Sequence, residues 1–374
     1  MRTVRDPRSQ EAIDQGIALW FPGPGSATGE DLAELHLHGG RAVVAAMLEL
    51  FATHPRCREA RHGEFARRAF ENGRIDFAQA EGLADLIEAE TDLQRRAALN
   101  LSEGGLGKLV DRWRSRLLTV SAMVEAELDF ADEGDVPPET EIRPILEALA
   151  EELADWLSKP PAERLKDGVR VVVAGPPNAG KSSLINVLAG RAVALVADEA
   201  GTTRDRIETP TAIEGVPLLL IDTAGLRRSE SAVEAMGVAL SHEAIADADL
   251  VLWLGDEGQA PDGSVLVLSK SDVRNGNGLA VSAKTGAGLE ELRRAILSYA
   301  RSLLPAPGGL ALNARHRQAI GLFKRELDLA LFEQDILLVA ENLRHARKAL
   351  ECIAGGSTTE DMLNALFRRL CIGK

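Results

Sequence analysis

The stretch from Val169 to Ser183, VRVVVAGPPNAGKSS, limits the possible folds of this chain more than any other. It opens with β-branched residues typical of a buried strand, and four residues separate the glycine at the start of its loop from Gly-Lys-Ser. This is the P-loop pattern, in which backbone N–H groups surround phosphates, Lys181 neutralises them and the hydroxyl of Ser182 binds Mg²⁺. Apolar residues at helical spacing follow in 184–188, so a helix N-terminus faces the anion. The stretch therefore predicts strand, phosphate loop and helix in that order.

Composition indicates a globular protein of two or three domains, because 374 residues with 45% hydrophobic side chains can form several cores. The net charge of -14 argues against polyanion binding over the whole surface. Three arginine pairs could still meet a phosphate backbone, although a solvated helix face is the simpler interpretation of each: Arg67-Arg68, Arg95-Arg96 and Arg368-Arg369.

Cysteine usage and hydropathy concern the compartment. Cys57, Cys352 and Cys371 form no CxxC motif and no even framework, which suits a reducing cytosol. No apolar run reaches about 18 residues and no signal peptide opens the chain. We therefore expect a soluble cytoplasmic protein that does not enter a membrane.

Helical periodicity appears in two separate parts of the chain. Apolar residues recur at i, i+3, i+4 and i+7 in 78–130, which predicts long amphipathic helices, and a further helix is expected over 142–157. The pattern returns in 314–348 and again in 359–370. Two half-bundles that cannot bury their apolar faces alone would pair, so the simplest account is one discontinuous helical domain interrupted at about 168–300. Two separate small bundles remain the alternative. The periodic positions include Leu83, Leu86, Ile87, Leu117, Val120, Val124 and Leu128.

The first 40 residues have a different character. After a basic, irregular opening, the run from Gly16 to Phe21 indicates a strand whose partners could be missing. The turn-rich residues 22–26 follow. Helical segments are expected around 43–48 and 65–70.

A second motif lies after the P-loop helix. A buried strand ends in Asp222-Thr223-Ala224-Gly225, the DxxG pattern in which Asp222 acts through Mg²⁺ and the Gly225 amide senses a γ-phosphate. Thr202 or Thr203, in the segment AGTTRD, would supply the second hydroxyl on Mg²⁺.

Two further loops indicate which base the bound nucleotide carries. Asp272, in Ser-Lys-Ser-Asp after a strand, can accept hydrogen bonds from guanine N1 and N2, a donor pair that adenine lacks. Ser282-Ala283-Lys284 is then the loop expected to close on guanine O6. Four ordered motifs within about 110 residues predict a P-loop GTPase. The expected GTP contacts are Asn178, Ala179, Gly180, Lys181, Ser182, Ser183, Thr202, Thr203, Asp222, Thr223, Ala224, Gly225, Lys270, Asp272, Ser282, Ala283 and Lys284.

The residue after the DxxG motif decides the class of hydrolytic mechanism. It is Leu226, which cannot orient a water molecule as the glutamine of Ras-type GTPases does. Four candidates could replace it: Glu230, Glu234, an arginine of Arg227-Arg228, or a cation beside the phosphates. A slow GTPase that needs an external activator is the simpler alternative.

Beyond these motifs the chain resembles the tRNA-modification GTPases of the TrmE/MnmE family over nearly its whole length. GPPNAGKSS, AGTTRD and DTAGLR are shared with related GTPases. The segments that are specific to the family are FPGPGSATGEDLAELHLHGG (residues 21–40), GEFARRAFENGRIDFAQAEGLADLI (residues 63–87) and the terminal CIGK (residues 371–374).

The resemblance implies an α/β plus all-α fold: a Ras-like P-loop G domain inserted into a discontinuous helical domain, with a partial α+β N-terminal folate-binding domain. The implied boundaries are 1–70 for the N-terminal folate-binding and dimerisation domain, 71–167 and 301–374 for the two halves of the helical domain, and 168–300 for the G domain.

The resemblance also implies an activity and partners. In the family, potassium-dependent dimerisation of the G domains and GTP hydrolysis are coupled to modification of the wobble uridine of certain tRNAs. An FAD- and NADH-using GidA-type partner shares the work and adds aminomethyl-type groups at uridine C5. We therefore expect a homodimer that joins this partner in a heterotetramer and acts on tRNA.

Individual residues carry over by motif. The potassium ion would be bound by Asn178 with the loop that contains Ala197, Glu199 and Thr202, and it would supply the positive charge of an arginine finger. Mg²⁺ would be bound by Ser182 and Thr203. Glu234, nine residues beyond Gly225, matches the glutamate that orients the attacking water through a second water molecule.

The folate site and the terminal motif also carry over. Glu34 and Arg74 match positions that contact 5-formyl-tetrahydrofolate, and the terminal Lys374 would approach the same site; Arg74 stands where the family often has lysine. Cys371 lies in the terminal motif and is a candidate catalytic thiol, with a small buried thiol as the alternative.

The chain departs from the family in three places. It lacks the apolar strands with which the family's N-terminal domain normally begins, which form part of the folate site and dimer surface. Ser269 replaces the usual asparagine of the guanine motif, so we expect a brace of the P-loop to be lost and nucleotide affinity to fall. Only nine residues separate Asp272 from Ser282. Two alternatives are an Era-type regulatory switch in ribosome assembly and a truncated family member that retains only GTPase activity.

Overall fold

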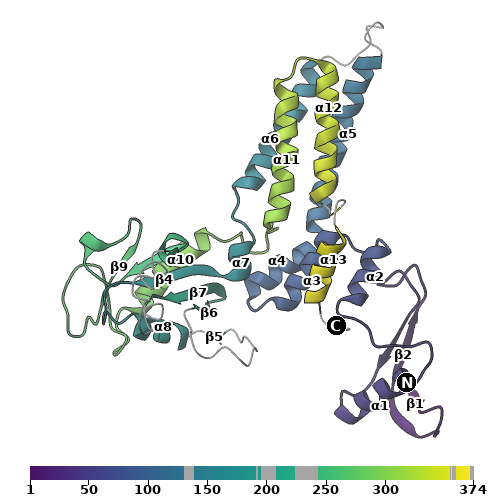
Figure 1. The fold of residues 1–374 in the computed structure, drawn as a ribbon, viewed down its shortest axis with the longest axis horizontal. Coiled ribbons are helices and arrows are strands. Elements are labelled where there is room, and N and C mark those ends of the chain that lie inside the picture. The colour runs from purple at the N-terminus through teal and green to yellow at the C-terminus, as the bar shows by residue number, and fades with distance from the viewer. Residues whose placement is uncertain are drawn as a thin grey trace, which may run out of the picture.

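The computed structural model describes residues 1–129, 139–190, 193–194, 208–223, 243–353, 355 and 359–370. A long helical bundle rises from a junction of short helices, and two β-sheets lie on opposite sides of its base (Figure 1). The larger sheet carries the P-loop, and the smaller one is N-terminal.

The N-terminal part is a three-stranded antiparallel sheet followed by two helices. Its strands are β1 (Arg2–Arg5), β2 (Ala12–Phe21) and β3 (Leu32–His36), and its helices are α1 (Arg41–Ala52) and α2 (Glu64–Glu71). The expectation that the strand at Gly16–Phe21 has no partners is wrong. It pairs with β1 through Arg2 and Gly16 and with β3 through Ile17 and His36, because the basic opening residues take an extended conformation alongside it.

Apolar side chains of this part remain in contact with solvent. Trp20 on β2 is 62% exposed and Leu48 on α1 is 60% exposed; Ile17 and Phe21 are also exposed. A group of exposed large apolar residues of this kind is typical of a surface that another molecule covers.

The helical part contains residues from both ends of the chain. Its helices are α3 (Phe77–Glu88), α4 (Asp92–Ser102), α5 (Gly105–Asp129), α6 (Glu139–Ser158), α11 (Ala314–Phe332), α12 (Ile336–Ile353) and α13 (Glu360–Arg369). Leu117 and Val124 of α5 are buried in the same core as Phe323 of α11 and Leu343 of α12. The two stretches with helical periodicity therefore form one bundle rather than two.

Of the expected apolar positions on α3, Leu83 and Leu86 are partly buried, and the most buried positions are small residues. Ile87 is 38% exposed, whereas Ala80 and Ala84 are fully buried. A Cβ atom on Gly82 would lie 2.5 Å from the backbone nitrogen of Ser102 at the end of α4. The small residues allow α3 and α4 to approach closely, while Phe77 and Leu83 of α3 pack in the same small core.

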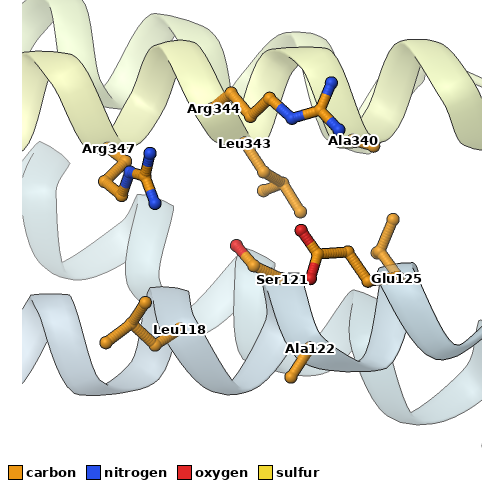
Figure 2. A pocket seen from close by; sticks show the side chains of 9 residues that line it. Leu118, Ser121, Ala122, Glu125, Ala340, Leu343, Arg344 and Arg347 are labelled. Carbon is orange, nitrogen blue, oxygen red and sulfur yellow. The ribbon is translucent and has the colours of Figure 1, made fainter.

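A groove of about 190 Å³ lies between α5 and α12. Figure 2 shows Ser121 and Glu125 of α5 facing Leu343 and Arg344 of α12 across it. The guanidinium group of Arg344 is 3.1 Å from Glu341 on its own helix. The side of the bundle is therefore open to polar groups, while its interior is apolar.

The α/β part follows α7 (Glu163–Asp167). Its sheet has seven strands in the order β10-β9-β8-β4-β7-β6-β5, of which β5 and β6 are antiparallel to their neighbours and the others are parallel. The strands are β4 (Val169–Ala174), β5 (Val193–Ala194), β6 (Glu208–Ile213), β7 (Val216–Asp222), β8 (Leu250–Trp253), β9 (Val265–Ser269) and β10 (Leu279–Val281). The helices are α8 (Lys181–Gly190) and α10 (Leu289–Ser302), with a 3₁₀ turn at Glu257–Gln259. Strand β4 is central and almost wholly buried, as its β-branched sequence predicts.

Charged side chains join α7 to the last helix. The ammonium group of Lys166, three residues before β4, lies 3.3 Å from Asp85 and 3.5 Å from Glu88, both on α3. Arg369 at the end of α13 contacts the same two carboxylates at 2.8 and 2.7 Å. The hydrogen bond from Arg369 lowers the pKa of Glu88, so this carboxylate stays ionised at neutral pH. The strand that carries the P-loop and α13 are thus joined through α3.

None of the helices in the described ranges combines the length and apolar character that spanning a lipid bilayer requires.

Candidate nucleotide-binding site

The loop between β4 and α8 has the backbone conformation of a phosphate loop. Gly175, Asn178 and Gly180 all have positive φ, at 141°, 60° and 96°. A Cβ atom on Gly175 would lie 2.8 Å from the carbonyl oxygen of Leu254, so only glycine fits there. The backbone turns tightly enough to direct successive N–H groups at an anion before the first turn of α8.

Lys181 lies inside this loop. Its side chain is buried, and its ammonium group donates hydrogen bonds to the carbonyl oxygens of Gly175 at 2.9 Å and Pro176 at 2.8 Å. These contacts hold the positive charge where the motif places the β- and γ-phosphates.

Two oxygen groups meet beside the loop. The hydroxyl of Ser182 donates a hydrogen bond of 2.6 Å to the carboxylate of Asp222. They are brought together because β4 and β7 are parallel neighbours that pair Val173 with Asp222, so both strands end at the same edge of the sheet. Thr223 supports this arrangement, since its buried hydroxyl donates to the carbonyl oxygen of Val173 at 3.0 Å.

This pair of oxygens fits a magnesium ion. Mg²⁺ prefers hard oxygen ligands and keeps several water molecules, so one hydroxyl with a carboxylate acting through water is a suitable donor set. Ser182 would bind the ion directly and Asp222 through water. The remaining predicted ligand, Thr203, lies outside the described residues.

A pocket of about 390 Å³ lies between α8 and the loops after β9 and β10. Gly180 and Leu184 line one side, and Asp272, Ser282 and Lys284 line the other. The hydroxyl of Ser282 is fully buried and donates to Asp272 at 2.8 Å. This hydrogen bond lowers the pKa of Asp272, which keeps the carboxylate ionised and able to accept from guanine N1 and N2. The two predicted base-recognition loops are therefore brought together beside the P-loop.

The expected loss of a brace at Ser269 is wrong. The Ser269 hydroxyl donates a hydrogen bond of 2.5 Å to the carbonyl oxygen of Ala179 in the P-loop. The neighbouring Lys270 ammonium group donates to the carbonyl oxygen of Asn178 at 2.8 Å. A short hydroxyl at the end of β9 thus makes the contact for which a longer amide was expected. Sequence reasoning missed it because the motif alone does not give the distance between β9 and the P-loop.

Several predicted residues lie outside the described part of the chain. They are Ala197, Glu199, Thr202, Thr203, Ala224, Gly225, Leu226, Glu234, Cys371 and Lys374. Of the potassium ligands, only Asn178 is described.

The two described folate residues lie in neighbouring segments. Glu34 is on β3, and its carboxylate is 2.9 Å from Nε2 of His36. Arg74 follows α2, and its side chain lies against the turn at Gly29, where an added Cβ atom would be 3.3 Å from Arg74 Cγ. Within the described residues, no hydrogen bond or ion pair joins Glu34 to Arg74.

Comparison with known proteins covers nearly the whole chain. The family model described as "MnmE helical domain" matches residues 77–371, and the model described as "GTP-binding protein TrmE N-terminus" matches residues 1–74. The tRNA modification GTPase MnmE of Rhizorhabdus wittichii is 51% identical over an alignment of 380 positions, which covers 100% of this chain and 86% of that protein. The protein of the same name from Novosphingobium aromaticivorans is 49% identical over an alignment of 394 positions, which covers 100% of this chain and 90% of its own length.

Among solved structures, the G domain of the T. maritima FeoB iron transporter is 29% identical and covers 35% of this chain and 98% of its own, with a TM-score of 0.27. That score is too low to bear on the fold of the whole chain. The matches to the two family models and the near full-length identity to curated proteins show that this chain belongs to the MnmE family of tRNA modification GTPases.

Proposed function

We propose that this chain hydrolyses GTP as one component of a system that modifies C5 of the wobble uridine in certain tRNAs. The proposal rests on one observation, which is that the phosphate-binding loop and the pocket for the base lie next to each other. The P-loop and its Ser182–Asp222 pair lie beside a guanine pocket that contains the ionised Asp272. Family membership supports the coupling of this site to tRNA modification.

The described residues would bind and orient the nucleotide. Lys181 would transfer its hydrogen bonds from loop carbonyls to the β- and γ-phosphates, and the loop N–H groups would hold their oxygens. A bound Mg²⁺ neutralises developing negative charge between the β- and γ-phosphates. Ser182 would be its direct ligand in this region, with Asp222 orienting a water molecule on it.

Water activation needs a group other than a glutamine, because Leu226 follows the DxxG motif. We assign the orientation of the attacking water to Glu234. A potassium ion bound by Asn178, with the loop of Ala197, Glu199 and Thr202, would supply the positive charge that an arginine finger supplies elsewhere.

The proposal includes partners. A GidA-type FAD-binding protein would perform the redox chemistry, tRNA would be the substrate, and the chain would act as a cytoplasmic homodimer. The exposed apolar residues of β2 and α1, among them Trp20 and Leu48, support association through the N-terminal part. Glu34, Arg74 and Lys374 would bind 5-formyl-tetrahydrofolate there, with Cys371 near it as a candidate catalytic thiol.

The test is GTP turnover by the purified chain in matched potassium and sodium buffers. We expect faster turnover in potassium, because Na⁺ is too small to satisfy the same ligands; equal rates would contradict the role of Asn178. Calorimetry with 5-formyl-tetrahydrofolate on the same sample tests the folate site independently. Addition of the flavoprotein, NADH and unmodified tRNA, followed by nucleoside mass spectrometry, tests the modification itself, and a tRNA without a wobble uridine is the control.

A further inference from the structure

A wide groove lined by arginines lies far from the nucleotide site, and neither the family description nor the proposed chemistry gives it a role. It measures about 670 Å³ and is formed by the segment 58–62, α2 and α13. These elements lie together on the other side of the bundle base from the P-loop helix α8 (Figure 1). We call it the arginine groove. The arginines that line it are Arg58, Arg61, Arg67, Arg68 and Arg368.

The arginine groove carries an excess of positive charge on a chain whose net charge is -14. Its lining contains five arginines and His62 against three glutamates, Glu64, Glu71 and Glu360. An acidic protein repels polyanions over most of its surface, so a local basic concavity determines where one can approach. The charge pattern therefore marks this groove as a place that a polyanion can approach.

Three of the arginines are held in fixed positions by carboxylates. Arg58 contacts both carboxylate oxygens of Glu64, at 2.6 and 2.7 Å, and Arg68 contacts Glu64 at 2.8 Å. The hydrogen bond from Arg58 is the main reason why the pKa of Glu64 lies far below its ordinary value. Arg67 reaches across to Glu360 on α13 at 2.5 Å. These pairs fix the walls of the groove.

Two arginines of the groove, Arg61 and Arg368, are free to contact a ligand. The exposed side chains of Arg61 and Arg368 make no ion pair or hydrogen bond within the described residues, and neither does the side chain of His62. A planar guanidinium group with unused N–H donors is suited to bidentate contact with a phosphate. The two free arginines come from different elements, one before α2 and the other near the end of α13.

The groove is a built surface rather than two loose segments. Gly63, at φ 65°, allows the start of α2 to approach α13 so closely that a Cβ atom there would be 2.2 Å from the carbonyl oxygen of Phe367. Beneath the groove, the ring of Phe70 packs against Phe77 and Phe367 with centroids 6.3 and 6.2 Å away. The backbone next to Arg61 and Arg368 is therefore held in place by this packing.

We propose that the arginine groove binds the sugar-phosphate backbone of tRNA, an inference that rests on the proposed function for the identity of the substrate. A small anion is a poor occupant, because one contact with an exposed guanidinium group in water contributes little. A chain of regularly spaced phosphates makes several such contacts at once and releases counterions. Binding here would also bring RNA to α13, whose last residue, Arg369, is two positions before Cys371 in the sequence.

The test measures binding of an unmodified tRNA with a wobble uridine to the full chain, by fluorescence anisotropy over a range of KCl concentrations. The test variant is R61Q/R368Q, which leaves the paired arginines in place. The matched control is R95Q/R96Q on α4, which removes the same number of exposed arginines from residues paired only with Asp92. For the test variant we expect at least tenfold weaker binding and a salt slope reduced by about 2, with GTP turnover unchanged.

The affinities of the control variant, the test variant and the wild type for tRNA each test the proposal. The control variant should bind tRNA within about twofold of the wild type, whereas an equal loss in both variants would show a nonspecific charge effect and overturn the groove. Wild-type affinity in R61Q/R368Q would overturn it as well. If the wild-type chain fails to bind tRNA even at low salt, both the groove and the tRNA part of the proposed function are wrong. If the groove binds phosphate, the charge reversal R61E/R368E should weaken tRNA binding further than R61Q/R368Q does; equal affinities of these two variants would contradict it.

Discussion

The hydroxyl of Ser269 donates a hydrogen bond to the carbonyl oxygen of Ala179 and so ties the end of β9 to the P-loop. The two residues are 90 positions apart in the sequence. They meet because β9 and β4, the strand that leads into the P-loop, both end at the same edge of the sheet. The contact links recognition of the base to recognition of the phosphates.

Replacing Ser269 with alanine tests this link. We expect GDP and GTP to bind about 3- to 10-fold more weakly, because one hydrogen bond contributes about 0.5–1.5 kcal/mol and the carbonyl oxygen of Ala179 loses its partner. The measurement is a titration with a fluorescent guanine nucleotide. Ser271→Ala, two residues further along the same loop, is the control. Unchanged affinity in S269A would show that the bond does not stabilise the bound loop.

Glu234→Ala tests the source of the attacking water. We expect kcat to fall by about 100-fold or more while nucleotide affinity changes little, because a group that acts in the transition state affects the rate and not ground-state binding. Single-turnover hydrolysis in potassium gives the rate, and the same titration gives the affinity. Glu230→Ala is the matched control, and an equal loss in both variants would leave neither residue with a specific role.

Gly63→Ala tests the contact between α2 and α13. We expect a loss of stability of more than about 1 kcal/mol at this contact, because the new Cβ atom would overlap the carbonyl oxygen of Phe367 and the backbone has positive φ. Gly73→Ala is a close control, since it has the same φ of 65° and no atom within 4 Å of the added Cβ. Hydrogen exchange at α13 should increase in G63A and remain at the wild-type level in G73A. Equal exchange in both variants would assign the effect to φ alone.

Glu81 joins α3 to the start of α11 through Arg315 at 2.7 Å and His316 at 3.0 Å. Burial raises the pKa of Glu81, but the hydrogen bonds from His316 and Arg315 outweigh burial and bring it to about 2. Glu81→Gln should lower the free energy of unfolding of the helical part by roughly 1–3 kcal/mol at neutral pH, because the partly buried Arg315 loses its charged partner but keeps its hydrogen bonds to the carbonyl oxygens of Cys352 and Ile353. Urea unfolding followed by circular dichroism measures this. Asp111→Asn, which breaks the exposed pair with Arg114, should have almost no effect.

The pH dependence of the stability follows from the lowered pKa of Glu81. A carboxylate whose pKa is lower in the folded than in the unfolded protein stabilises the fold above its ordinary pKa of about 4.5. That contribution is lost as the pH falls from about 4.5 toward 2. The difference between wild type and E81Q should therefore shrink across this interval. A difference that stays constant would contradict the depressed pKa.

Local patterns predicted the elements around the nucleotide site well. The β-branched run at Val169 and the glycine spacing that follows it depend only on neighbouring residues, and the structure confirms the strand, loop and helix. The partners of β2 and the buried face of α3 could not be predicted in the same way. They depend on which other segment packs there, and alanine-rich contact faces such as Ala80 and Ala84 give weak periodic signals.

The arginine groove could not be predicted from the sequence for the same reason. Arg67-Arg68 and Arg368-Arg369 look alike in the sequence, as exposed pairs on helices. In the structure Arg369 is engaged by Asp85 and Glu88, while Arg368 has no such partner. The fold decides which members of a charged pair remain available, because the neutralising carboxylates come from distant parts of the chain.

Asp85 and Glu88 are shared by Lys166, just before the P-loop strand, and by Arg369 at the end of α13. If nucleotide binding or hydrolysis displaces β4, α7 moves with it, and Lys166 either pulls α3 along or releases its two carboxylates to Arg369 alone. In the first case the last helix is shifted, and in the second it is held more tightly. These ion pairs thus form a continuous path from α7, next to the P-loop strand, to α13, and a displacement of β4 would reach the last described helix along it.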